Sequence, residues 1–260
     1  MDLGIKGRHA IVCAASAGLG RACAESLARE GCDLTIIART PENVRRAADD
    51  ISRAHGVRVT PVAGDVNTEA GREALLAACP SPDILVTSPG TRQVPGDFRT
   101  WDRAEWERWW NEHFFTAVEL IRRTAPGMCE RKFGRVVNIS VSFIKFPQVG
   151  FAHSHSARAG LAAAIASMAR ELIPHNVTLN SVCPGLFDTE ALRVNLHGHA
   201  ARGNTTYEAI VQNRLQTCPA GRFADPSECG DLVAYLCSAQ AGFITAQNIV
   251  NDGGFYQGLF

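Results

Sequence analysis

Residues 153–160, HSHSARAG, bring together side chains that can transfer protons and bind anions. His153, His155 and Arg158 lie there among serines. Histidine titrates near neutral pH and can act as a general acid or base, whereas an arginine stays protonated and can hold a ribose or an anion. The stretch opens an alanine-rich apolar segment that predicts a buried helix over 156–173. It is therefore either a polar helix start or the place where the chemistry occurs.

A second stretch, AASAGLG at residues 14–20, has the composition of a nucleotide-binding turn. It lies between a predicted strand at 9–15 and a predicted helix at 21–31. Small residues let the backbone approach a pyrophosphate, and a helix N-terminus favours its negative charge. The second strand ends in Ala38-Arg39, where an acid would bind a ribose 2′-hydroxyl and an arginine accommodates a 2′-phosphate. NADP is therefore favoured over NAD, the alternatives being a plain turn and a solvated arginine.

The elements that position these stretches alternate along the whole chain. Short apolar segments predict strands at 9–15, 33–38, 57–63, 83–88, 135–141, 176–182 and 247–251. Helical periodicity predicts helices at 21–31, 41–56, 69–79, 103–131, 156–173 and 226–238. This alternation is typical of a parallel sheet with helices on both faces. We expect one α/β domain over residues 1–260, with a polar, irregular flap at 187–217.

Composition and charge narrow the class of protein. Of the 260 residues 46% are hydrophobic, and the formal net charge is zero. Nucleic acid and anionic membranes attract proteins with an excess of Lys and Arg, so neither is an expected partner. The 9 cysteines are scattered without a C-x-x-C pair, which favours reduced thiols in a cytoplasmic protein and predicts no metal site. Neither a signal peptide nor a membrane span is predicted.

The chain resembles the short-chain dehydrogenase/reductase family over essentially its entire length. The family motif T-G-x-x-x-G-x-G is matched after the first strand, with Ala14 in place of its first glycine. The motif P-G-x-x-x-T is intact at Pro184, Gly185 and Thr189. Further stretches resemble family motifs: Asp65-Val66 after the third strand, Thr87-Ser88-Pro89-Gly90 after the fourth, and the C-terminal GRFADPSECGDLVAYLCS with NIVNDGG.

This resemblance implies a Rossmann-type, doubly wound sheet of about seven parallel strands, NADP as cofactor and a small-molecule substrate. Within the family the chain is most similar to β-ketoacyl-carrier-protein reductases. The implied cofactor-binding residues are Ala14, Ser16, Gly18, Leu19, Gly20, Arg39, Asp65, Val66, Ser88, Pro89, Gly90, Arg158, Pro184, Gly185 and Thr189.

The resemblance also shows that the family's catalytic Tyr and Lys are replaced. In the family the Tyr protonates or deprotonates the substrate oxygen, and the Lys lowers the pKa of the Tyr. The frame Y-x-x-x-K-A-G puts Ser154 at the Tyr position and Arg158 at the Lys position. A serine hydroxyl is far less acidic than a phenol, whose pKa is about 10, and a permanently protonated arginine cannot relay a proton.

The family's catalytic Ser and Asn are replaced as well. The Ser position falls on Val141, with Ser140 and Ser142 on either side. The Asn position falls on His113, with Asn111 on a different helical face. The histidines can alternatively cap or pack against the long helices. The candidate catalytic residues are Ser154, Arg158, His155, His113 and Ser142, and His153 is a further histidine of the cluster.

Three functions are compatible with this pattern. The intact cofactor motifs favour an NADP-dependent oxidoreductase, a carbonyl reductase or alcohol dehydrogenase with a non-standard proton donor. The loss of the Tyr and Lys leaves open a non-redox lyase or isomerase on the same scaffold, or a nucleotide-binding pseudoenzyme.

Apolar surfaces and the family resemblance predict a homodimer or homotetramer. The helix at 156–173 is apolar nearly all round, so it should meet the sheet on one side and a second subunit on the other. The C-terminal FYQGLF should pack on a neighbouring subunit or line a pocket. Charged residues of the flap could meet an anionic substrate, although solvated charges explain them more simply: Arg193, His197, His199 and Arg202.

Overall fold

The computed structural model describes residues 2–88 and 95–259, and its centre is a parallel sheet. The strands are β1 His9–Cys13, β2 Asp33–Ala38, β3 Val59–Ala63, β4 Ile84–Thr87, β5 Gly134–Ile139, β6 Val177–Pro184 and β7 Asn248–Asn251. Their order is β3-β2-β1-β4-β5-β6-β7, and neighbouring strands pair in parallel. The order reverses between β1 and β4, which is where ligands bind in sheets of this kind. The predicted doubly wound fold is confirmed.

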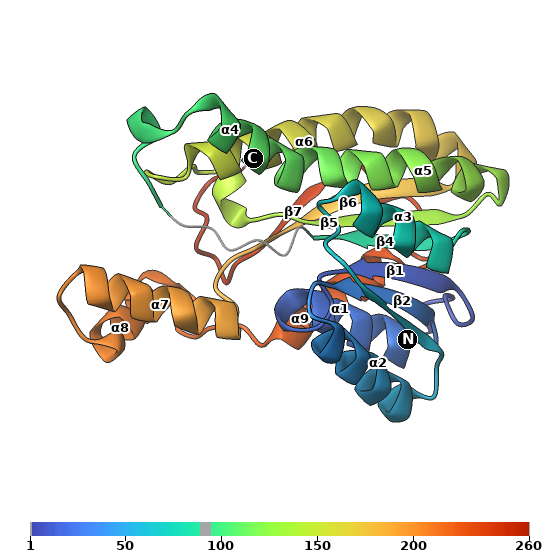
Figure 1. Cartoon of the computed structure of the whole chain (residues 1–260), viewed down its shortest axis with the longest axis horizontal. Coiled ribbons are helices and arrows are strands. Elements are labelled where there is room, and N and C mark those ends of the chain that lie inside the picture. The colour runs from blue at the N-terminus through green and yellow to red at the C-terminus, as the bar shows by residue number, and fades with distance from the viewer. Residues whose placement is uncertain (1, 89–94, 260) are drawn as a thin grey trace.

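Helices cover both faces of the sheet (Figure 1). One layer contains α1 Gly18–Arg29, α2 Pro41–His55 and α9 Pro226–Leu236, and the other contains α3 Glu69–Ala78, α5 Thr116–Glu130 and α6 Ala152–Leu172. Next to the second layer lies α4 Arg103–Trp110, and the pair α7 Glu190–Arg202 and α8 Tyr207–Thr217 projects beyond the sheet. Short turns are η1 Phe98–Thr100, η2 Asn111–Phe115, η3 Ser142–Ile144 and η4 Ile173–His175.

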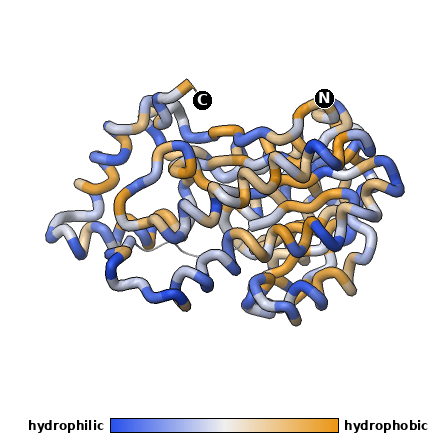
Figure 2. Tube along the Cα trace, turned by 90° about the horizontal axis from the view of Figure 1, so that it is seen from above, coloured by the Kyte–Doolittle hydropathy of each residue, from blue (hydrophilic) through white to orange (hydrophobic). Residues whose placement is uncertain are grey.

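Two apolar cores hold the layers together, one on each face of the sheet. The central strands carry buried residues at every position, as strands covered on both sides require. Figure 2 shows the resulting hydrophobic stretches in the middle of the molecule. The helices α1 and α9 pack closely because Gly230 has no side chain, and an added Cβ would lie 2.4 Å from the Ala22 carbonyl oxygen.

The helix that carries HSHSARAG begins four residues earlier than expected. Gly150 turns the chain with φ +86°, and the Phe151 carbonyl then accepts the first helical hydrogen bond from the His155 N–H at 2.9 Å. The residues from His153 onward are therefore inside α6 rather than ahead of it. Positions four apart lie on one helix face, so Ser154 and Arg158 share a face.

The long helix predicted at 103–131 is divided by a π-helical turn, η2. The extra residue in this turn changes the direction in which the following side chains point. The segment 187–217, expected to be irregular, instead forms α7 and α8. Thr189 and Thr206 cap them by accepting hydrogen bonds from the backbone N–H groups of Leu192 and Ala209. These helices were not predicted because both are largely exposed, so their sequences are polar and lack an apolar face.

Among the helices of the described residues, none combines the length and the hydrophobicity that crossing a membrane demands. The cysteines are free thiols, and all but Cys129 are buried.

Candidate functional site

A cavity of about 770 Å³ lies at the strand-order reversal, beside the turn that follows β1. It is lined by eleven of the predicted cofactor residues: Ala14, Ser16, Gly18, Leu19, Gly20, Arg39, Asp65, Val66, Ser88, Arg158 and Thr189. Pro184 and Gly185 are not among the lining residues, and Gly185 lies close to Asp252. Pro89 and Gly90 lie outside the described residues. Ser140, next to the predicted Ser position, also lines the cavity, as do residues that no motif indicated, among them Ala17, Thr40, Asn43, Ile139, Glu190 and Val194.

The turn after β1 is shaped to hold a phosphate group. Gly18 has φ +57°, and an added Cβ on Gly20 would lie 2.4 Å from the Ala14 carbonyl oxygen. Ala17 occupies the N-cap of α1 and makes no side-chain cap hydrogen bond. By contrast, Thr68 caps α3 by accepting from the Gly71 N–H. The first amides of α1 are thus available to an anion, with the positive end of the helix dipole behind them.

The far end of the cavity carries a cation suited to a 2′-phosphate. Arg39 is exposed at the end of β2 and makes no ion pair with another described residue. Thr40 and Asn43 line the cavity beside it. A planar guanidinium binds phosphate through two parallel hydrogen bonds. The arrangement therefore fits a phosphorylated ribose.

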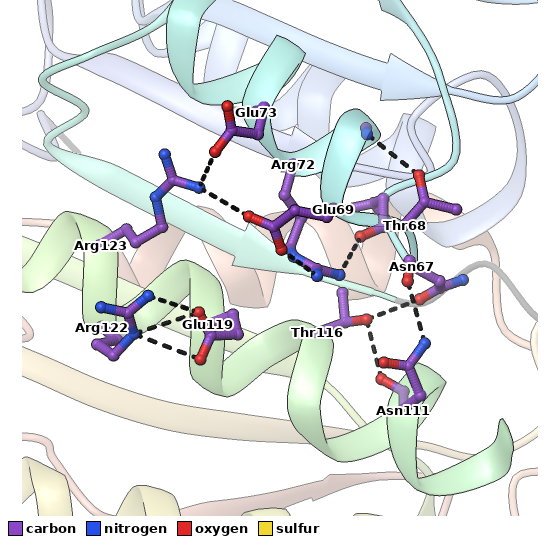
Figure 3. A network of polar contacts seen from close by, with 12 residues as sticks. Asn67, Thr68, Glu69, Arg72, Glu73, Asn111, Thr116, Glu119, Arg122 and Arg123 are labelled. Atoms are coloured by element: carbon purple, nitrogen blue, oxygen red, sulfur yellow. Dashed lines mark hydrogen bonds and ion pairs between the residues drawn. The ribbon is translucent and has the colours of Figure 1, made fainter. Parts of the chain in front are cut away.

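The loop after β3 is tied to the π-helical turn (Figure 3). Asn111 donates from its side chain to the Asn67 carbonyl at 3.0 Å, and the Thr116 hydroxyl donates to the Asn67 side-chain oxygen at 3.0 Å. The Asp65 carboxylate accepts from the Asn67 N–H at 2.9 Å. Asn111 is therefore engaged by the loop that borders the cavity, and His113 is the side chain of η2 that joins the histidine cluster.

His113 is a buried, neutral imidazole. Its ring packs against Trp109, with 5.1 Å between centroids. Neither ring nitrogen has a hydrogen-bond partner among the described residues. Burial, and then the positive charge of Arg158, lowers the pKa of His113 to about 2. A histidine with such a low pKa cannot act as a protonated general acid at neutral pH.

His153 belongs to an aromatic stack. Its ring lies 3.9 Å from the Trp101 ring at an interplanar angle of 17°, and 4.3 Å from the Trp109 ring. Burial lowers its pKa. These contacts give His153 a packing role, which is the alternative raised for the histidines.

His155 offers a hydrogen-bond donor from a defined ring nitrogen. Its Nδ1 accepts from the Gln148 N–H at 3.3 Å, so the proton of the neutral ring is on Nε2. Nε2 is buried without a partner among the described residues. Burial, and then the charge of Arg158, lowers the pKa of His155 to about 4. The ring is therefore neutral near pH 7, and a neutral imidazole can polarise a carbonyl through its N–H.

Arg158 supplies the positive charge of the site. It lines the cavity while remaining only 7% exposed. Its Nη1 donates to the Ile139 carbonyl at 3.2 Å, and its Nε has no partner among the described residues. Burial lowers the pKa of Arg158 to about 10, so it stays protonated at neutral pH. The other candidate catalytic residues are buried outside the lining of the cavity: His113, Ser142, Ser154 and His155. The hydroxyls of Ser142 and Ser154 have no partner among the described residues.

Two of the four residues of 187–217 that could meet an anionic substrate contact neighbours in the same segment. Arg193 pairs with Asp188 at 2.9 Å, and the His197 ring stacks on Tyr207 at 4.1 Å. The C-terminal segment packs on its own chain, with Phe255 and Tyr256 against Phe146 at 5.6 and 5.4 Å.

A parallel sheet with a phosphate-binding turn at its order reversal defines a dinucleotide-binding protein. Residues 13–256 match the family described as enoyl-(acyl carrier protein) reductase. The chain belongs to this family of short-chain dehydrogenases/reductases.

Known relatives match the chain over nearly its full length. It is 30% identical to the uncharacterized oxidoreductase YvaG of Bacillus subtilis, with all of both chains covered. It is also 30% identical to the 3-oxoacyl-(acyl-carrier-protein) reductase FabG of Aquifex aeolicus, over 98% of this chain and 100% of the relative. The structure of L-sorbose reductase from Gluconobacter frateurii, complexed with NADPH and L-sorbose, superimposes with a TM-score of 0.93 at 28% identity and covers 100% of both chains.

Proposed function

We propose that the protein is an NADP(H)-dependent oxidoreductase that interconverts a carbonyl and an alcohol with a non-standard proton donor. The observation that carries the proposal is one continuous cavity. It runs from the phosphate-binding turn to Arg158, at the position that the motif frame predicts for the family's catalytic Lys. The related L-sorbose reductase, with its bound NADPH, supports the same cofactor for this chain.

Different residues of the cavity would hold different parts of the cofactor. The α1 amides and Gly18 would hold the pyrophosphate, Arg39 the 2′-phosphate, and Asp65 with Val66 the adenine. When bound, NADPH supplies a hydride to the substrate carbon. The start of α7 lines the cavity through Glu190 and Val194, next to Thr189, and this supports the role of residues 187–217 as a flap.

His155 and Arg158 act on the substrate oxygen in this proposal. They are three positions apart on α6, so their side chains lie on neighbouring parts of one helix surface. The Nε2–H of His155 donates a hydrogen bond to the carbonyl oxygen, and the charge of Arg158 stabilises the negative charge that develops there. The oxygen then takes its proton from water in the cavity.

The test is oxidation of NADPH, followed at 340 nm with a panel of ketones and aldehydes. For any substrate that turns over, the variant His155→Ala should lower kcat about 100-fold, as loss of one donor to a developing oxyanion does. Ser156→Ala is the matched control, because Ser156 only donates to the His153 carbonyl. Equal rates for His155→Ala and the wild type would contradict the role of His155.

The missing Tyr and Lys favour a second candidate, a nucleotide-binding protein without redox activity. It predicts that NADPH raises Tm while no substrate of the panel consumes it. A ligand at 100 times its Kd adds about 2.7 kcal/mol of stability. Turnover of a substrate without net change at 340 nm would instead indicate a lyase or isomerase.

We also propose a homodimer or homotetramer in the cytoplasm. The outer face of α6 exposes Ala159 and Ala163, and Phe115 beside it is 51% exposed. These apolar groups support a subunit contact on α5 and α6. The free thiols support a reducing compartment.

A further inference from the structure

A buried cation of α6 has no acid to receive it. Arg158 lines the cavity and is 7% exposed. Its Nε has no hydrogen-bond partner among the described residues. A guanidinium only donates hydrogen bonds. A negatively charged ligand that accepts hydrogen bonds, such as a carboxylate, therefore matches this side chain.

Two other buried arginines show how this chain normally satisfies such a charge. Arg135 donates to the carbonyls of Ser238, Gly134 and Asn176 at 3.0, 2.8 and 2.8 Å, and it lies over the Phe133 ring. Arg72 also has an Nε without a partner among the described residues, but it pairs with Glu69 at 2.7 Å and donates to the Val66 carbonyl. Arg158 donates to one backbone carbonyl, that of Ile139, and it has no carboxylate partner among the described residues.

A buried cation that lacks an anion is costly, and proteins compensate it by pairing. The cofactor phosphates are one source of negative charge, but their binding turn lies after β1. Arg158 lies against the end of β5, which is two strands away in the sheet. Strands are spaced by about 4.8 Å, so the two places are about 10 Å apart across the sheet. The substrate is the nearer source of an anion.

We propose that Arg158 binds a carboxylate carried by the substrate next to its reacting carbonyl, so that the substrate is a 2-oxo acid or the corresponding 2-hydroxy acid. The inference rests on the proposed function. The planar guanidinium can hold both oxygens of a carboxylate. A carboxylate adjacent to the carbonyl keeps the charge beside Arg158 while the carbonyl oxygen faces the His155 Nε2–H.

The experiment compares anions with neutral isosteres on the NADP⁺-saturated protein. Benzoylformate is paired with 1-phenyl-1,2-propanedione, and 2-oxobutanoate with 2,3-pentanedione. Binding is measured by calorimetry, and NADPH oxidation is measured separately at 340 nm. Each anion should bind about ten- to a hundredfold more tightly than its neutral isostere, as charge-assisted hydrogen bonds imply.

Variants of Arg158 test whether this residue causes the tighter binding of the anion. Arg158→Gln should abolish the preference for the anion, and Arg158→Lys should retain most of it because the charge remains. Arg193→Gln is the control, since Arg193 is paired with Asp188 on the flap. A cooperative thermal unfolding transition without ligand reports whether each variant is folded. If Arg158→Gln fails to fold, Arg158→Met, which keeps a long side chain without the charge, tests the same site.

The outcomes separate this inference from the proposed function. Carboxylate binding that depends on Arg158, without NADPH oxidation, would support the anion site and contradict the redox proposal. Turnover of neutral ketones as efficient as that of the acids would support the redox proposal and overturn the anion site. A loss of NADPH affinity in Arg158→Gln, with carboxylate binding unchanged, would assign the charge to the cofactor and also overturn the inference.

Discussion

The histidines around Arg158 differ in what their ring nitrogens contact. His153 is stacked between Trp101 and Trp109. His155 has one nitrogen occupied by the Gln148 N–H and the other unpartnered. The tautomer of a histidine follows from the hydrogen bond that its second nitrogen makes. This difference makes His155, rather than His153, the residue to test for an action on substrate.

The buried neutral histidines should make the protein less stable in mild acid. Their pKa values are about 2 for His113 and about 4 for His155, below the unfolded value of 6.5. Between pH 6.5 and 4 the unfolded chain therefore binds more protons, so the free energy of unfolding falls as the pH falls. Each histidine contributes up to about 1.4 kcal/mol per pH unit.

The variant His113→Asn should flatten this dependence. Urea unfolding at several pH values between 7 and 4 measures it, with His55→Asn as a control on a half-exposed histidine of α2. Burial is the main cause of the low pKa of His113, and the charges of Arg158, His153 and Arg108 add to it. If the free energy of unfolding of His113→Asn falls with pH as steeply as that of the wild type, groups other than His113 cause the pH dependence.

Sequence patterns and family resemblance identified the residue types of the site but not their hydrogen bonds. The spacing from Ser154 to Arg158 followed from the frame of the motif. The tautomer of His155 depends on Gln148, a residue of the preceding loop whose backbone position no local pattern predicts. Likewise, the separation of His113 from Asn111 depends on a π-helical turn that periodicity alone does not show.

Among the elements of the fold, we expect the turn from β1 to α1 to be the one in which a substitution lowers NADPH affinity most. Gly20→Ala would place a Cβ 2.4 Å from the Ala14 carbonyl oxygen, so the backbone of the turn must shift. We expect NADPH affinity to fall at least tenfold, because overpacking of a rigid site costs about 1–3 kcal/mol. Fluorescence titration with NADPH measures it.

Gly198→Ala is the matched control for this prediction. An added Cβ there meets only the end of the flexible Arg202 side chain at 3.4 Å. Alanine also favours a helix over glycine, so α7 should be as stable as before and NADPH affinity unchanged. Equal affinities for both variants would show that the turn tolerates rearrangement.

Strands were easier to predict than the helices of the flap. Each strand of the sheet is a short apolar run, and all seven were predicted within a few residues of their bounds. The helices α7 and α8 have few buried residues, so they lack a hydrophobic stripe and depend on the caps Thr189 and Thr206. An exposed helix needs no periodic apolar residues, so the polar composition of 187–217 led to the prediction of an irregular segment.

For the whole molecule, the proposed assembly can be tested on α6. Ala163→Arg places a charge on the exposed face of this helix. Light scattering should give a multiple of 28.0 kDa for the wild type and a smaller mass for the variant. Ala70→Arg, on the exposed surface of α3, is the control and should keep the wild-type mass. A wild-type monomer at micromolar concentration would contradict the assembly.

The reversal of strand order between β1 and β4 divides the residues around the cavity between two halves of the sheet. The turn after β1, Arg39 after β2 and Asp65 after β3 all belong to one half. His113, Ser142, Ser154 and Arg158 all come from connections in the other half, which also contributes Thr189 to the cavity lining. We therefore expect that residues of the second half can be exchanged while the first half still selects the phosphate groups of the cofactor. A chimera with the residues 95–186 of a conventional relative should inherit the relative's reaction and retain this chain's choice of cofactor.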